Sequence, residues 1–116
     1  MASRQKELKE DAKLRVFQLI NENPQLTSRE IAEKVRISNG SAYYLLASLI
    51  DKGFVKFINF KENSQKTKYA YLLTPKGIRE KSLITHKFLE RKRIEYKLLK
   101  KEITKLEQDA GLIVKL

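Results

Sequence analysis

The 116-residue sequence contains no cysteine, a single histidine (His86), and no apolar run long enough to cross a bilayer. Without cysteine there is no disulfide framework and no thiolate ligand, and one histidine excludes a metal site built from several imidazoles. A membrane-spanning helix needs roughly 18 or more consecutive apolar residues, and the first ten residues have no apolar signal-peptide core. We therefore expect a cytoplasmic protein with no metal, no cofactor and no membrane partner.

Candidates for enzymatic chemistry are also lacking. The sequence has no glycine-rich phosphate loop, and no evident nucleophile accompanies His86, which falls within a long helical pattern. We assign no catalytic residue and expect the protein not to be an enzyme. His86 is interpreted as a surface or interface residue.

Positive charge is what the chain has in excess. It carries 25 Lys and Arg against 14 Asp and Glu, for a net charge of +11. Residues 54–75 contribute +3 and residues 76–108 contribute +6, whereas residues 1–53 contribute only +2. Such an excess favours nucleic acid or another anionic surface as a partner, although a solvated basic surface gives the same total.

Two helices are predicted before residue 36. Apolar residues at helical spacing predict a helix over residues 3–22, which ends before Pro24. Thr27 and Glu30 form a capping-box pattern that starts a short helix, Ser28–Val35. The apolar stripe of the first helix consists of Leu8, Ala12, Val16, Phe17, Leu19 and Ile20.

A third helix follows after a very short connection. Only Arg36 and Ile37 separate the second helix from Ser38, which can cap the next one, and Gly53 can end it. Two helices joined so tightly predict a helix-turn-helix that presents its second helix; a helical hairpin in another small domain is the alternative. Arg36 stands where a glycine is common, so we expect some backbone strain there. The inward face of this helix comprises Ala42, Leu45, Leu46 and Leu49.

A β-hairpin is predicted next. Residues 54–60 and 69–73 are rich in β-branched and aromatic side chains, and residues 61–68 between them are polar and turn-forming. A helix-turn-helix followed by a hairpin is a winged helix. The expected fold class is therefore mostly α with a small β-hairpin wing (α+β).

The last predicted helix begins at Thr74, as cap, and Pro75, and runs to about Asp109. Its first part, with Ile78, Leu83 and Ile84, is expected to pack on the winged domain. A helix of roughly 35 residues extends about 50 Å, which is too long to pack wholly on so small a domain.

Two rows of apolar residues at heptad spacing indicate how the rest of this helix is covered. We expect a homodimer, with pairing against the N-terminal helix of the same chain as the alternative. The chain then divides into a DNA-binding domain (residues 1–75), a coiled-coil-like dimerisation helix (76–110) and a tail (111–116) without an assigned role. The expected dimer contacts are Leu89, Tyr96, Leu99, Ile103 and Leu106.

The presented helix of a winged helix fits a DNA major groove. Its outward face is small, polar and aromatic, with no Lys or Arg before Lys52, which indicates a contact surface. The expected base-reading residues are Asn39, Gly40, Ser41, Tyr43 and Tyr44, and the expected backbone contacts are Ser28, Arg29 and Ser38. The expected wing contacts are Lys61, Lys66 and Lys68, for which simple solvation is the alternative; for the tyrosines, the alternative is packing on the wing or a dimer partner.

Several short motifs resemble the MarR family of bacterial transcriptional regulators. A narrower set is similar to the MarR-like regulators associated with exopolysaccharide (EPS) biosynthesis loci. The resemblance implies a dimeric DNA-binding regulator of surface-polysaccharide genes. The first set consists of Asn23–Pro24, Leu26–Thr27, Arg29–Ala32, Leu49–Gly53 and Leu73–Gly77; the second consists of Val55–Lys56, Asn59–Phe60, Tyr69–Pro75, Phe88–Lys92 and Glu95–Tyr96.

The chain departs from the family pattern at two places. Many members carry an Asp-Arg pair near the wing tip, where this chain has Gln65 and Lys66, so that minor-groove contact differs. Many also have an additional N-terminal helix, whereas one helix precedes Thr27 here.

The sequence is therefore compatible with two functions. The first is a homodimeric regulator that binds double-stranded DNA sequence-specifically. The alternative is a winged-helix adaptor for protein interactions, dimerised through its C-terminal helix, which the nearly uncharged presented helix favours. The operator, the direction of regulation and any small-molecule effector are not indicated by the sequence.

Overall fold

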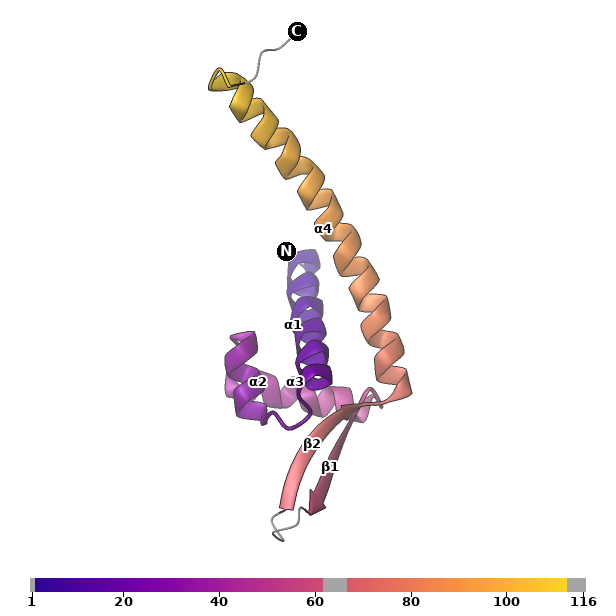
Figure 1. Ribbon diagram of the computed structural model, residues 1–116. Coiled ribbons are helices and arrows are strands. Elements are labelled where there is room, and N and C mark those ends of the chain that lie inside the picture. The colour runs from indigo at the N-terminus through magenta and orange to yellow at the C-terminus, as the bar shows by residue number, and fades with distance from the viewer. Residues whose placement is uncertain (1, 62–66, 113–116) are drawn as a thin grey trace. The chain divides into compact units, whose positions relative to one another are not determined.

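The computed structural model describes residues 2–61 and 67–112. It contains four helices and one antiparallel hairpin, and it divides into two compact units, residues 1–84 and residues 85–116. Figure 1 shows the winged helix-turn-helix arrangement of the first unit, which confirms the predicted fold class. The elements are α1 (Ala2–Glu22), α2 (Ser28–Val35), α3 (Asn39–Asp51), β1 (Val55–Lys61), β2 (Thr67–Leu73) and α4 (Pro75–Asp109).

The helix starts are set by side-chain caps, as predicted. The Thr27 hydroxyl accepts a hydrogen bond from the Glu30 N–H at 3.1 Å, and the Glu30 carboxylate accepts one from the Thr27 N–H at 3.1 Å. The hydroxyl of Ser38 accepts from the N–H of Ser41 at 3.0 Å. Each cap satisfies a backbone donor that the first turn leaves without a partner.

The turn between α2 and α3 carries the expected backbone strain. Arg36 has φ 63° and ψ 46° and is the only non-glycine residue of the described chain with positive φ. Its left-handed conformation lets the N–H of Ile37 reach the carbonyl of Ala32 at 3.0 Å, which closes α2. A side chain in this conformation costs about 1–2 kcal/mol, which the adjoining packed helices offset.

The core lies where the second half of α1 meets α2, α3 and β1. Its largest fully buried side chains are Phe17, Ile20, Ile31, Leu49, Val16 and Val55. Leu8 was predicted to belong to the buried stripe of α1, but it is 59% exposed, and Leu14 is buried instead. In Figure 1 the first half of α1 extends beyond α2 and α3.

The hairpin strands reach farther toward the tip than predicted. Val55 lies opposite Leu73, and the pairing continues to Lys61 opposite Thr67. The backbone of Tyr71 ties the wing to the segment between α1 and α2, because its N–H donates to the carbonyl of Pro24 at 2.9 Å.

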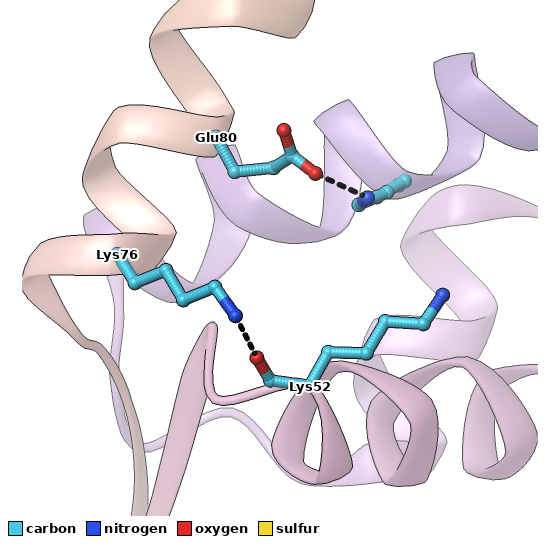
Figure 2. A network of polar contacts seen from close by, with 4 residues as sticks. Lys52, Lys76 and Glu80 are labelled. Atoms are coloured by element: carbon cyan, nitrogen blue, oxygen red, sulfur yellow. Dashed lines mark hydrogen bonds and ion pairs between the residues drawn. The ribbon is translucent and has the colours of Figure 1, made fainter.

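The first turns of α4 are held against α1 and against the segment between α3 and β1. A Cβ atom on Gly77 would lie 2.0 Å from the carbonyl oxygen of Phe54, so only glycine fits here without movement. The Nζ of Lys13 pairs with Glu80 at 3.0 Å, and the Nζ of Lys76 donates to the carbonyl of Lys52 at 2.9 Å (Figure 2). Both ammonium groups also lie about 5 Å from the centre of the Phe54 ring, at 4.8 and 5.0 Å.

Two of the three apolar residues expected to dock α4 do not. Ile84 is buried, but Ile78 and Leu83 are 57% and 61% exposed. Gly77 and Ile84 lie on the same side of the helix, seven residues apart, and this narrow face makes the contact, whereas Ile78 and Leu83 point elsewhere.

The second unit is the remainder of α4 and its end. Glu95 contacts Arg91 at 3.8 Å and Lys92 at 3.1 Å. The helix ends at Asp109, and Gly111 follows it with φ 75°, so that the N–H of Leu112 reaches the carbonyl of Glu107 at 2.9 Å. Across the described residues of both units, no helix is long and apolar enough to cross a membrane, and no metal-binding cluster is found.

Candidate nucleic-acid interface

The N-terminal end of α3 presents backbone donors and an amide side chain. Asn39 and Gly40 are exposed and begin the helix. Among the hydrogen bonds of the described residues, none is donated by their N–H groups, which carry the partial positive charge of the helix end. This end of α3 can therefore approach a phosphate or the acceptors on a base edge.

The hydroxyl groups of the two serines at this end differ in whether they can still donate a hydrogen bond. The hydroxyl of Ser38 accepts from the Ser41 N–H and donates to the Ser41 hydroxyl at 2.9 Å, so the cap occupies it in both directions. The hydroxyl hydrogen of Ser41 remains available to an outside acceptor. Contact of either residue with DNA stays a prediction.

Gly40 is not required by the packing of the chain. A Cβ added there would meet no atom closer than the Ser38 hydroxyl oxygen at 4.0 Å. Its φ also lies outside the positive range that favours glycine. The missing side chain thus leaves an open, flat surface at the exposed end of α3, where a partner can come close.

The exposed tyrosines of α3 point to different neighbours. Tyr43 and Tyr44 are 68% and 78% exposed. Tyr43 lies near the wing: burial raises the pKa of the Tyr71 phenol, and the neighbouring Tyr43 raises it further. Tyr44 lines an open groove together with Leu8 and Lys9 from the first half of α1. The alternative of partial packing on the wing therefore applies to Tyr43 and not to Tyr44.

The start of α2 offers a second set of backbone donors. Arg29 is exposed and Ser28 is half-buried. The capping box engages the N–H of Glu30 and leaves the N–H groups of Ser28 and Arg29 without a partner among the described residues. A phosphate contact at this end is chemically reasonable, and it stays a prediction.

The wing lysines lie on different faces. Strand alternation places Lys61 on the same face as Phe57, whereas Lys68, opposite Phe60, lies on the other face. Lys61 is exposed and Lys68 is half-buried. Lys66 and Gln65 lie outside the described residues. Of the three lysines expected on the wing, the two that the structure describes thus lie on opposite faces, and their contact with DNA stays a prediction.

A row of three aromatic rings on the wing was not anticipated as a site. Phe57, Tyr69 and Tyr71 share one face of the hairpin, and we call them the aromatic row. The strand register would have placed them together, but the sequence alone does not give that register.

An open groove beside α3 was also missed. About 850 Å³ in volume, it separates α3 from the first half of α1. Its apolar lining includes the exposed Leu8 together with Ile37, Tyr44 and Leu45, and its rim carries Lys6, Lys9, Lys13 and Lys52. The exposure of Leu8 in the structure follows from this groove, and no signal in the sequence indicated it.

The five residues expected at a dimer interface are all exposed in the single chain. Their exposed fractions run from 43% for Leu89 to 64% for Tyr96. Ile94 and Leu98, at 56% and 62%, are exposed on another side of the helix. These apolar side chains of α4 are thus not buried against other described residues of the chain.

Comparison with known proteins supports the fold from the sequence and from the backbone. Residues 9–56 match a family model described as winged helix-turn-helix DNA-binding. This segment comprises most of α1, all of α2 and α3, and the first two residues of β1. No curated protein sequence matches the chain.

The similar solved structures include named transcriptional regulators. A PadR-like transcriptional regulator from Bacillus cereus has a TM-score of 0.65 at 16% identity, covering 75% of this chain and 89% of its own. A MepR variant from S. aureus has a TM-score of 0.61 at 17% identity, covering 94% and 90%. FabT from Streptococcus pneumoniae, in complex with DNA, has a TM-score of 0.52 at 20% identity, covering 85% and 73%. At these identities the similarity is one of fold.

Proposed function

We propose that the protein is a transcriptional regulator that binds double-stranded DNA as a homodimer, with α3 in the major groove. The observation that carries the proposal is the exposed N-terminal end of α3. There Asn39 and Gly40 combine N–H groups that have no partner among the described residues, an amide, and a glycine that packing does not require. An Asn amide can pair with an adenine edge, and absence of a side chain permits close approach. The net charge of +11 supports a polyanionic partner and a cytoplasmic location beside the chromosome.

The narrower proposal concerns the genes controlled. The sequence motifs at residues 55–60, 69–75 and 88–96 support regulation of exopolysaccharide genes, as their resemblance implies. This assignment is tested by asking whether the DNA upstream of such genes in the source genome competes with the sequences that the protein selects.

Selection of bound sequences from random duplex DNA tests the main proposal. Wild type is expected to enrich a two-fold symmetric site. The Asn39→Ala variant should lose preference at one base pair per half-site, by about 1–3 kcal/mol, whereas Lys61→Ala should weaken all sequences alike and reduce the salt slope by about 1. Identical profiles for the two variants would contradict the assignment of α3 as the reading helix.

The adaptor function remains the second candidate because α3 carries so little charge. Its outward face has no Lys or Arg before Lys52. A correctly folded protein that binds no duplex at any salt concentration would move the proposal to a protein partner on this face.

A further inference from the structure

The aromatic row on one face of the wing combines a stacked pair, Phe57 and Tyr69, with a contact between Phe57 and Tyr71 that is tilted by 37°. The rings of Phe57 and Tyr69 are nearly parallel, with an interplanar angle of 6° and centres 5.4 Å apart. Phe57 also contacts Tyr71, with centres 4.8 Å apart. Phe57 is therefore the middle ring, and Tyr69 is the end of the stack. Tyr69 is 54% exposed, which leaves ring surface available to another planar group.

A small hollow lies between the aromatic row and the segment before α2. Its volume is about 200 Å³, several times the roughly 30 Å³ that one water occupies in the liquid. The aromatic row forms one wall, and Gln25, Leu26, Thr27 and Ser28 form the rest of the lining. The hydrogen bond from Tyr71 to Pro24 holds the wing to that segment, so the hollow is built into the fold.

This lining selects for a ring with a planar face and a polar edge. The rings of the row offer stacking, while the amide of Gln25 and the hydroxyl of Ser28 can donate or accept hydrogen bonds. Asn59 lies directly opposite Tyr69 on the same face of the hairpin, so a second amide stands next to the aromatic row, outside the lining of the hollow. A saturated sugar ring can stack only through its C–H groups and has no π face of its own, and a phenylalanine side chain does not supply the polar edge.

Positive charge near the hollow favours a ligand that is negatively charged. Lys61 follows Asn59 on the same face of β1, and the exposed Arg29 follows Ser28 on α2. The N–H groups of Ser28 and Arg29 are also unpaired among the described residues. A planar heterocycle with a polar edge, attached to a negatively charged backbone, is a nucleotide of a nucleic-acid strand.

We propose that the hollow beside the aromatic row receives an unpaired nucleobase stacked on Tyr69, so that the wing binds single-stranded nucleic acid. Stacking of a base on an aromatic side chain is tolerant of sequence, since every base has a π face. This activity goes beyond duplex recognition and uses residues other than those of α3, so the two sites can be tested separately.

The test compares oligothymidylate with an abasic strand of the same length, by fluorescence anisotropy of labelled strands. Both carry the same phosphates, but only the first has bases. Wild type should bind oligothymidylate more tightly than the abasic strand. The Tyr69→Ala variant should lose about 5- to 150-fold in affinity for oligothymidylate and bind both strands alike, whereas Tyr69→Phe should retain the difference.

Two further variants keep the result interpretable. Tyr69→Leu retains apolar bulk against Phe57 without a π face. It should lose the same affinity for oligothymidylate as Tyr69→Ala, and it provides the test if the alanine variant does not fold. Leu72→Ala removes a 37% exposed side chain from the opposite face of the same strand, and it should leave oligothymidylate binding unchanged. Thermal unfolding monitored by circular dichroism shows which variants are folded.

Three outcomes would overturn the proposal. The first is equal affinity of wild type for oligothymidylate and the abasic strand, and the second is a Tyr69→Leu variant that binds oligothymidylate as wild type does. The third is an equal loss of blunt-duplex and single-strand binding in the Tyr69 variants, which would assign the face to duplex recognition. Binding of oligothymidylate without any duplex binding would instead refute the proposed regulator and leave this inference standing.

Discussion

Two glycines of the chain have opposite structural meaning. A Cβ on Gly77 would collide with the main chain of Phe54, at 2.0 Å from its carbonyl oxygen, whereas a Cβ on Gly40 would have its nearest neighbour at 4.0 Å. Backbone atoms cannot yield as a flexible side chain does. Gly77 is thus required by the contact between α4 and the residue that precedes β1, whereas the packing of the described residues does not require Gly40.

Substitution of these glycines tests this reading. Gly77→Ala should lower the free energy of unfolding by about 1–3 kcal/mol, because the added methyl forces the start of α4 away from β1. The matched control, Gly40→Ala, should leave stability unchanged or raise it by up to about 1 kcal/mol through helix propensity. Urea unfolding measures both. A Gly77→Ala protein as stable as wild type would show that the docked position of α4 is wrong.

At the scale of the elements, local signals predicted the helix ends well. Thr27 with Glu30, Ser38, Gly53 and Thr74 each act through bonds or backbone angles within a few residues, so the sequence displays them. Burial along the helices was less predictable. It depends on whether a partner element packs closely, as Leu8 shows: its spacing fits the apolar stripe of α1, but an open groove separates it from α3.

The candidate site shows the same division between local and distant causes. The exposed start of α3 followed from its cap and its short connection to α2. The aromatic row did not, because Phe57 and Tyr71 meet only through the strand register, and the hollow also needs the bond from Tyr71 to Pro24. Whether any of these residues contacts DNA stays a prediction.

The link between α1 and the start of α4 supplies a prediction at this scale. The Lys13–Glu80 pair is only 20–25% exposed, so solvent screens it less than a surface pair, and the nearby Phe54 ring also faces the ammonium group at 4.8 Å. A double-mutant cycle with Lys13→Met and Glu80→Gln should give a coupling free energy near the upper end of the surface-pair range, about 1 kcal/mol. Additive losses in urea unfolding would mean that the pair does not join the two helices.

At the scale of the molecule, one winged domain reads too little DNA for a specific site unless it acts with a second copy. The exposed apolar rows of α4 are the surface that we propose for that copy. Leu89, Tyr96 and Ile103 recur at seven residues, as do Leu99 and Leu106, and all five are exposed. Two winged domains held by such a pairing would meet half-sites about one helical turn apart.

Neighbouring leucines make the dimer proposal testable with a matched control. Leu99→Lys places a charge in the expected interface and should weaken dimerisation at least about tenfold, because the charge is desolvated there. Leu98→Lys makes the same change one residue away, at a side chain with a similar exposed fraction of 62% against 54%, and should leave the dimer intact. Sedimentation distinguishes the 13.6 kDa chain from its dimer. A wild type that sediments as a monomer at every concentration, or two variants that behave alike, would assign the apolar rows to another partner.

If the dimer forms, moving the selected half-sites apart by about half a helical turn should abolish its binding, because the second α3 would then face the wrong side of the duplex.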